Sequence, residues 1–207
     1  MLKGFINNVR HSPHSPAIII GEKVYTYFQL MEIAYSISLQ IEGNHPSTRL
    51  IGVYTDYGVY TYASIIAILF KGYGFVPINK KFPDDKLAHI IKNSEINIIL
   101  CNSSSTTDLQ PMIMEAGIRL IINDEIELAG VELNHYNAGH STDTGYVLFT
   151  SGSTGVPKGI GISHENFSAF IQAIHYSGTY DFKPFDRVLQ IFELSFDVSI
   201  ACTFIAW

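Results

Sequence analysis

The sequence predicts an α/β fold in which helices flank a largely parallel sheet. Short apolar segments of β-like composition recur along the chain, helical segments separate most of them, and no linker, repeat or low-complexity tract interrupts the alternation. Parallel strands need such crossover helices, because a tight turn cannot join their ends. We therefore expect the chain to fold as one structural unit covering residues 1–207.

The first half of the sequence predicts its elements most clearly. Gly21 and Glu22 separate two short β-like segments, which indicates a hairpin. Thr26 can cap a following helix whose apolar residues recur at helical spacing, and Gly72 ends a second apolar helix. The expected strands are residues 17–20, 23–25, 50–54, 75–78 and 96–101, and the expected helices are residues 26–42, 59–71 and 83–94.

The second half shows weaker periodicity. Residues 102–108 are polar and predict a loop, and residues 123–144 predict irregular or edge structure. The expected strands are residues 119–122, 146–150 and 160–163, and the expected helices are residues 164–176 and 198–207.

The composition is typical of a folded protein and argues against nucleic acid as a binding partner. Hydrophobic residues make up 47% of the chain, too many for a disordered protein. A formal net charge of −6 without any dense basic run argues against a nucleic-acid partner. No apolar stretch is long enough to span a membrane, and the first residues lack the core of a secretory signal. Cys101 and Cys202 have no metal-type spacing, so we expect reduced thiols in a cytoplasmic protein.

Residues 150–159 read T-S-G-S-T-G-V-P-K-G and follow a β-like segment. Their glycines let backbone N–H groups approach an anion closely, and four hydroxyl groups and Lys158 add donors and a positive charge. The Walker pattern fails because Pro157 and Gly159 flank the lysine, and the G-x-S-x-G and dinucleotide patterns fail as well. The segment therefore predicts a phosphate-binding loop rather than a plain turn.

These ten residues match the phosphate-binding signature of the adenylate-forming superfamily, which includes acyl-CoA synthetases, luciferases and nonribosomal peptide synthetase adenylation domains. Further segments resemble the same family: T-Y-F-Q-L at 26–30, L-F-K-G-Y-G-F-V-P-I-N at 69–79 and S-H-E-N at 163–166. In the first of these segments Gln29 replaces a usual Glu. The resemblance covers nearly the whole chain and is most similar to the amino-acid adenylation domains.

The resemblance implies that a substrate carboxylate attacks the α-phosphate of ATP, releases pyrophosphate and then passes its acyl group to a thiol. Mg²⁺ would share the charge on the leaving pyrophosphate, and no protein nucleophile is needed. Accordingly, no residue of this chain is expected to be catalytic in itself. The residues implied in binding the ATP phosphates are Thr150, Ser151, Gly152, Ser153, Thr154, Gly155 and Lys158.

Residues 192–199, F-E-L-S-F-D-V-S, resemble the element in which an Asp of amino-acid adenylation domains binds the substrate amino group. Asp197 takes that position, and a substrate ammonium would offset the cost of burying its carboxylate among apolar neighbours. The alternative is that Asp197 caps the helix that follows, and both roles can hold together. By the same resemblance Val198 and Ala201 line the side-chain pocket, but they do not identify the amino acid.

The remaining signals have plain structural interpretations. His11 and His14 lie in a Pro-rich start, and a metal site there is not expected; Glu193 could neighbour Mg²⁺ but is more simply structural. The helix at 198–207 is apolar and has no capping residue, so we expect it to pack against residues beyond this chain.

The leading hypothesis is an adenylation domain that loads the phosphopantetheine arm of a peptidyl carrier protein, cut before the rest of its large domain and its small C-terminal domain. The alternatives are a stand-alone acyl- or aryl-CoA ligase, against which Asp197 argues, and a non-catalytic truncated relative.

Overall fold

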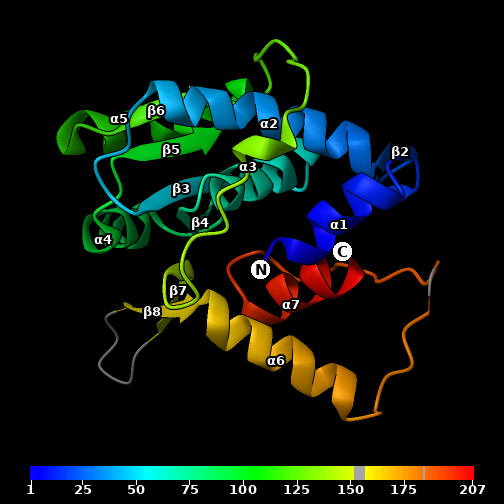
Figure 1. Cartoon of the computed structure of the whole chain (residues 1–207). Helices are drawn as coiled ribbons and strands as arrows, with labels where there is room; N and C mark the ends of the chain where they lie inside the picture. The colour runs from blue at the N-terminus through cyan, green and yellow to red at the C-terminus, as the bar shows by residue number, and fades with distance from the viewer. Residues whose placement is uncertain (152–156, 184) are drawn as a thin grey trace.

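The computed structural model describes residues 1–151, 157–183 and 185–207, and within them a six-stranded sheet and a separate hairpin. The sheet order is β6-β5-β3-β4-β7-β8, in which the first five strands run parallel and β8 runs antiparallel to β7. The α/β fold with a largely parallel sheet is therefore confirmed (Figure 1). The strands are β1 (Pro16–Ile20), β2 (Lys23–Thr26), β3 (Leu50–Thr55), β4 (Gly74–Asn79), β5 (Ile98–Cys101), β6 (Arg119–Ile122), β7 (Thr144–Ser151) and β8 (Pro157–Ser163).

Helices cover both faces of the sheet. Alternate strand residues such as Val53 and Leu100 point into a core shared with the first three helices and the last one, whereas Val76 and Ile99 point into a second core with the fourth and fifth helices. The side-chain period of two that defines a strand thus separates two apolar cores. The helices are α1 (Lys3–His11), α2 (Tyr27–Gly43), α3 (Val59–Phe70), α4 (Asp84–Ser94), α5 (Thr106–Ala116), α6 (His164–Tyr176) and α7 (Asp197–Ala206), with short 3₁₀ turns at Ser103–Ser105 and Leu133–His135.

Two helices begin with a reciprocal cap, and the first of these is at Thr26, where the sequence predicts a cap. Thr26 Oγ1 accepts from the Gln29 backbone at 3.2 Å, and the Gln29 side chain accepts from the Thr26 backbone at 3.0 Å. Ser163 and Asn166 repeat the arrangement at the start of α6. Both pairs satisfy donors that a helix N-terminus otherwise leaves open.

Gly74 fixes how closely β4 approaches β7. A Cβ atom at this position would collide with the backbone carbonyl oxygen of Thr144 and with the side chain of Leu50. Only glycine lets β7, and therefore the β7–β8 hairpin, lie against the central strands at this spacing.

The predicted loop at residues 102–108 is wrong, because the structure has a 3₁₀ turn at Ser103–Ser105 and the helix α5 from Thr106. Asp124, more than twenty residues away in the sequence, accepts from the Ser103 backbone at 2.7 Å and from its hydroxyl at 2.9 Å. This distant carboxylate holds the start of a segment whose local composition favours a loop.

The last helix, which was expected to pack against residues beyond this chain, also packs against the first elements of the chain itself. Trp207 lies 5.1 Å from the Phe5 ring and 6.4 Å from the Tyr62 ring between centroids, and its indole N–H donates to the Ala17 carbonyl at 3.0 Å. Ile200 is completely buried. Figure 1 shows α7 beside α1, so the two ends of the chain lie together.

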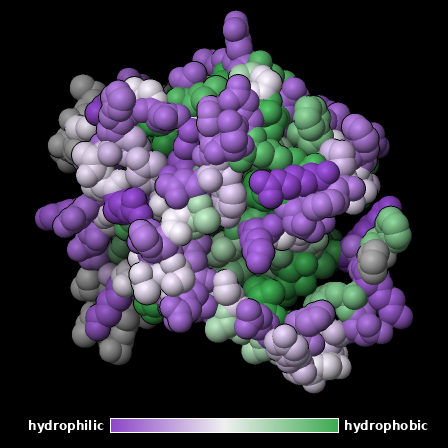
Figure 2. Space-filling view, in the orientation of Figure 1, coloured by the Kyte–Doolittle hydropathy of each residue, from purple (hydrophilic) through white to green (hydrophobic). Residues whose placement is uncertain are grey.

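Exposed apolar side chains gather instead on α6 and on the segment between α6 and α7, residues 177–183 and 185–196, here called the strap. Phe185 is 94% and Leu189 75% exposed. Figure 2 shows hydrophobic side chains reaching the surface in the lower part of the molecule. Within the described residues, no helix is both long and apolar enough to cross a membrane.

Candidate nucleotide and substrate site

The β7–β8 hairpin carries the predicted phosphate-binding residues. Thr150 and Lys158 are exposed and face each other across the two strands, followed by the pair Ser151 and Pro157. Of the predicted set, Gly152, Ser153, Thr154 and Gly155 lie outside the described residues. The described residues therefore bring the Thr150 hydroxyl and the Lys158 ammonium onto adjacent strands, next to the predicted phosphate-binding segment.

The hairpin reaches the carboxyl edge of the parallel strands. Phe75 of β4 pairs with Tyr146 of β7, and the same register continued by four residues places Asn79 level with Thr150. Thr55 of β3 pairs with Asn79 in turn. Ligands of open α/β sheets bind outside the carboxyl ends of the strands, so this edge is where a nucleotide site is expected.

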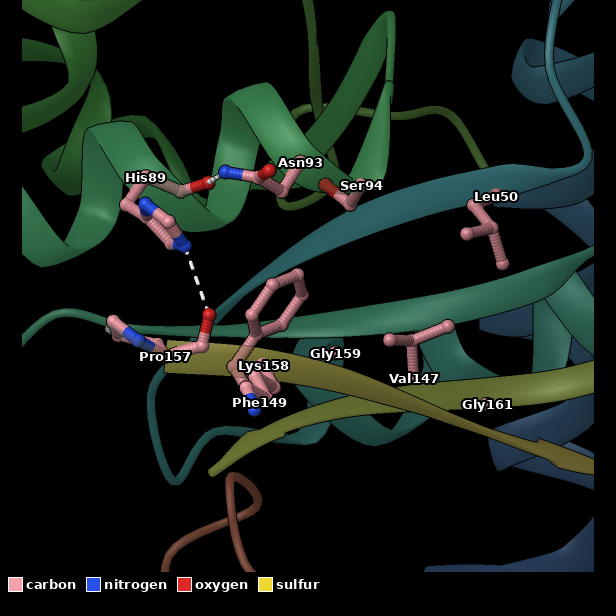
Figure 3. A pocket seen from close by; sticks show the side chains of 10 residues that line it. All are labelled: Leu50, His89, Asn93, Ser94, Val147, Phe149, Pro157, Lys158, Gly159 and Gly161. Atoms are coloured by element: carbon pink, nitrogen blue, oxygen red, sulfur yellow. Dashed lines mark hydrogen bonds between the residues drawn. The ribbon is translucent and has the colours of Figure 1, made fainter. Parts of the chain in front are cut away.

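A groove of about 480 Å³ runs along the other side of the hairpin, between α4 and β8 (Figure 3). The ring of Phe149 and the side chain of Val147 form its floor, beside Gly159 and Gly161. A Cβ at Gly159 would lie 3.0 Å from the Phe149 ring, so glycine lets that ring lie over β8. A ring nitrogen of His89, Nε2, lies 2.9 Å from the Pro157 carbonyl oxygen. This contact ties α4 to the first described residue after the loop. Among the predicted site residues that the structure describes, only Lys158 lines this groove.

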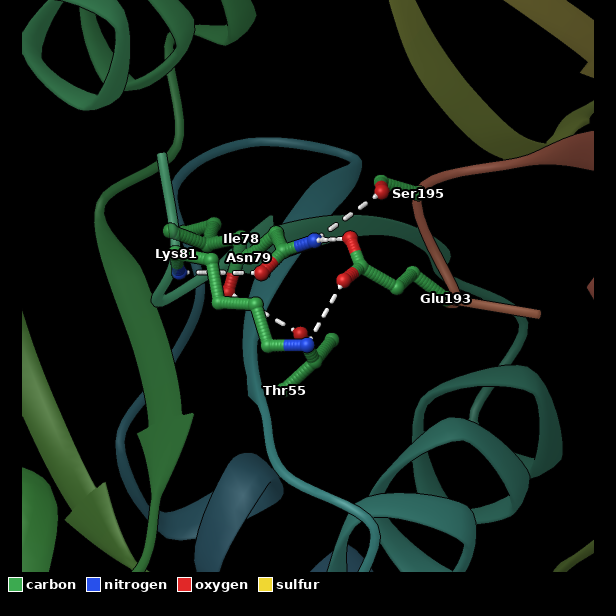
Figure 4. Close-up of polar contacts among 6 residues, drawn as sticks. All are labelled: Thr55, Ile78, Asn79, Lys81, Glu193 and Ser195. Carbon is green, nitrogen blue, oxygen red and sulfur yellow. Dashed lines mark hydrogen bonds and ion pairs between the residues drawn. The ribbon is translucent and has the colours of Figure 1, made fainter. Parts of the chain in front are cut away.

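A polar cluster joins the strap to the carboxyl end of β4 (Figure 4). The amide nitrogen of Asn79 donates to a Glu193 carboxylate oxygen and, at 3.2 Å, to the Ser195 hydroxyl. The Lys81 ammonium lies 2.9 Å from the other Glu193 oxygen and holds the pKa of that carboxyl below its usual value. Glu193 is therefore already paired with protein groups, which supports the structural interpretation of this residue over a role beside Mg²⁺.

Asp197 is the first residue of α7 rather than its cap, because Phe196 occupies the N-cap position. The side chain is exposed, whereas the sequence argument placed it among apolar neighbours, and one of its oxygens accepts from the Val198 backbone at 2.8 Å. A carboxylate in the first turn favourably meets the positive end of the helix dipole. Asp197 therefore stabilises the start of α7 from the first helical position, and the residue at the cap position is Phe196.

Asp197, Val198 and Ala201 lie on one side of α7, since residues three and four apart are neighbours on a helix surface. Val198 is 38% exposed and Ala201 9% exposed. The exposure of the side chains therefore falls along this side of the helix, from the exposed carboxylate of Asp197 to the nearly buried Ala201.

Tyr146 of the hairpin packs against α6 and feels the charge of Asp197, and no sequence pattern indicated it. Its ring is buried between Phe75 and Phe167, and burial, reinforced by the charge of Asp197, raises its pKa to about 12. A neutral phenol therefore lies within the field of Asp197, four residues before Thr150. Asn79, Lys81 and Ser195 were missed as well, although Asn79 and Ser195 lie in the segments 69–79 and 192–199 that the sequence motifs single out.

His164 lies in the S-H-E-N segment but belongs neither to the Thr150–Lys158 pair nor to the residues around Asp197. Its ring is buried, and its Nδ1 lies 3.3 Å from the Met1 amino group. Burial, together with that amino group, lowers its pKa. Among the described residues, no group of three His, Cys, Asp or Glu side chains could hold a metal ion.

Comparison with known proteins gives a consistent result. The family model of AMP-binding enzymes matches residues 5–207. Tyrocidine synthase 3 of Brevibacillus parabrevis is 29% identical over 97% of this chain and 3% of its own length, and gramicidin S synthase 2 of Brevibacillus brevis is 29% identical over 97% and 4%.

Two solved structures share the fold. The adenylation domain AlmE of Vibrio cholerae, in complex with glycyl-adenosine-5'-phosphate, has a TM-score of 0.79 at 19% identity, over 98% of this chain and 42% of that chain. The nonribosomal peptide synthetase FmoA3, in an α-methyl-L-serine-AMP-bound form, has a TM-score of 0.82 at 23% identity, over 98% and 22%. The chain thus spans less than half the length of each of these proteins.

Proposed function

The chain belongs to the family of AMP-binding enzymes, and from that premise we propose that it is the first part of a domain that activates an amino acid as its adenylate. ATP and Mg²⁺ are the other reactants, and the aminoacyl group then passes to the phosphopantetheine thiol of a carrier protein. The observation that carries this proposal is the meeting of Thr150 and Lys158 at the carboxyl edge of the parallel strands.

This arrangement suits the leaving pyrophosphate. The Lys158 ammonium and the Thr150 hydroxyl stand on adjacent strands, so both can face one anion without rearrangement of the sheet. A preorganised positive group and donors lower the free energy of a transition state in which negative charge develops on the leaving group. Gly152, Ser153, Thr154 and Gly155 would complete the clamp, and Ser151 precedes them.

Asp197 is proposed to bind the ammonium group of the substrate. Its carboxylate stands at the start of α7, near the buried Tyr146 of the same β7 strand that leads to Thr150. An ammonium bound there would be held a short way along the strand from the phosphate clamp. Val198 and Ala201 lie on the same side of the helix and are proposed to contact the substrate side chain.

The rest of the site is proposed to lie in parts of the protein outside these 207 residues. AlmE, which was solved with a glycyl adenylate, is more than twice the length of this chain. We expect the remainder of the large domain and a small C-terminal domain to complete the adenine, ribose and substrate contacts. We place the protein in the cytoplasm, where ATP is available and reducing conditions keep thiols free.

The test is amino-acid-dependent exchange between ATP and pyrophosphate by the natural protein that contains this sequence. Lys158→Ala should weaken exchange, and Asp197→Asn should lower amino-acid activation by roughly a hundredfold, because a bound ammonium loses its counter-charge. ATP affinity should change little in Asp197→Asn.

Asp108→Asn is the matched control, because Asp108 is also an exposed carboxylate in the first turn of a helix, α5. If both Asp variants lose the same activity, Asp197 acts on helix stability alone. Exchange driven by aryl or fatty acids, with transfer to coenzyme A, would favour the ligase alternative. No exchange with any acid would favour a non-catalytic relative.

A further inference from the structure

We propose that Asn79, Lys81 and Glu193 form a latch that positions the amino-group anchor Asp197. These are positioning residues, since each acts through the strap and none contacts the substrate. The inference rests on the proposed function of Asp197 and adds the device that fixes where that carboxylate stands.

The latch begins at the end of β4. Asn79 is 3% exposed, and its side-chain oxygen accepts from the Lys81 backbone at 3.0 Å. This bond fixes the orientation of the amide, so its nitrogen faces the Glu193 carboxylate and the Ser195 hydroxyl (Figure 4). Lys81 holds the second oxygen of Glu193 at 2.9 Å. The Glu193 side chain is thereby held by two protein groups that both belong to the end of β4.

Backbone bonds carry this constraint to the anchor. The Phe196 N–H donates to the Glu193 carbonyl at 2.9 Å, and the Ser199 N–H donates to the Phe196 carbonyl at 3.1 Å. Asp197 lies between the last two residues. A shift of Glu193 therefore moves the first turn of α7, and the position of the Asp197 carboxylate with it.

Beside the latch, the strap is held by Leu194 in the main core and by Gln190, whose side chain lies 3.5 Å from the Ser199 carbonyl. Leu194 is 3% exposed, but Phe192 and Phe196 on either side are 42% and 57% exposed, and Leu189 is more exposed still. The far end of α7 is held separately, by Trp207 and Phe204 in the main core. Ile200 in the first turn of α7 is also buried in the main core, so the latch acts on the exposed residues just before it and on Asp197 rather than on the whole helix.

The choice of an amide at position 79 follows from this geometry. The Asn79 amide donates to the carboxylate of Glu193, whereas an aspartate there would set two carboxylates against each other. Position 79 and position 193 should therefore be coupled. A carboxylate at 79 should be tolerated only when residue 193 becomes a donor.

The experiment compares Glu193→Gln, Asn79→Asp and the double variant in the natural protein, with Glu42→Gln as the matched control. Glu42 forms another Lys–Glu pair, 2.6 Å from Lys71, which takes no part in the latch. Amino-acid and ATP KM, kcat, and hydrogen exchange at the Phe196 and Ser199 amides are measured for each.

Glu193→Gln should raise the amino-acid KM about threefold and Asn79→Asp about tenfold, in keeping with lost charged contacts, while ATP KM changes less than about twofold. Exchange at the Phe196 amide should quicken in both. The double variant should recover most of the loss, because the new amide at 193 donates to the new carboxylate at 79, and such coupling is what a double-mutant cycle measures. Glu42→Gln should leave every value unchanged.

The latch is overturned if the two single variants keep wild-type amino-acid KM and Phe196 exchange, or if the double variant is no better than Asn79→Asp. Failure of the proposed function would look different, because wild-type protein would then show no amino-acid-dependent exchange. Even in that case, faster Phe196 exchange in Asn79→Asp and its recovery in the double variant would still test the latch.

Discussion

Helices α3 and α6 have nearly the same length but opposite surroundings. Eleven of the twelve residues of α3 are buried, whereas α6 buries only His164 and Phe167 among its thirteen. The first helix lies between the sheet and α2, and the second borders the strap with its exposed aromatic side chains. One region of the chain completes its own core, while the other presents apolar surface of the kind that other structure normally covers.

The largest expected difference between the two regions is in stability. Phe70→Ala should lower the free energy of unfolding by about 3–5 kcal/mol, because its ring is completely buried against Tyr35 and Tyr136. Phe170→Ala, which removes a ring that is 46% exposed on α6, should cost less than about 1 kcal/mol. Denaturant unfolding of the 207-residue chain, followed by circular dichroism, measures both. Similar losses would show that α6 is as well packed as α3.

A smaller difference is expected at the helix caps. Thr26→Ala and Ser163→Ala remove the same kind of cap, each worth about 1 kcal/mol. On α2, which is buried, the loss should appear in global unfolding. On α6 it should appear as local fraying, seen as faster hydrogen exchange in its first turn with little change in the unfolding midpoint. Equal midpoint shifts would mean that α6 unfolds together with the core.

The smallest effect on stability, and the clearest on association, is expected in the strap. Phe185→Ser with Leu189→Ser should change the free energy of unfolding by less than about 0.5 kcal/mol, since both side chains are largely exposed. The same variant should bind less of a hydrophobic dye and self-associate less in light scattering. Leu128→Ser, which removes an exposed leucine outside the strap, is the control. If the strap variant self-associates as much as the wild-type chain, the exposed apolar side chains of the strap do not cause the association.

The sequence predicted the parallel sheet well because its local signals agree with the packing. The capping residue Thr26 and the apolar run of α3 lie where the structure uses them. The helix α5 was missed because its start depends on Asp124, a contact between residues far apart in the sequence. Local composition carries no trace of such a partner.

The candidate site also contains residues that the sequence predicts and residues that only the fold brings together. Residues 150–158 and Asp197 are recognised by motif, because their chemistry requires particular residue types at fixed spacing. Tyr146, Lys81 and Glu193 acquire their relation to these residues only when β4, β7 and the strap are brought together. No periodicity marks a tyrosine on a strand or a lysine after one as part of a site.

Trp207 is the only tryptophan of the 207 residues. Its ring touches Phe5 of α1, Tyr62 of α3 and Phe204 of α7, and its N–H reaches β1. The indole is therefore a built-in fluorophore at the point where four elements, drawn from both ends of the chain, meet. A blue-shifted emission that moves to the red would report, from one optical signal, that the first and last helices have come apart.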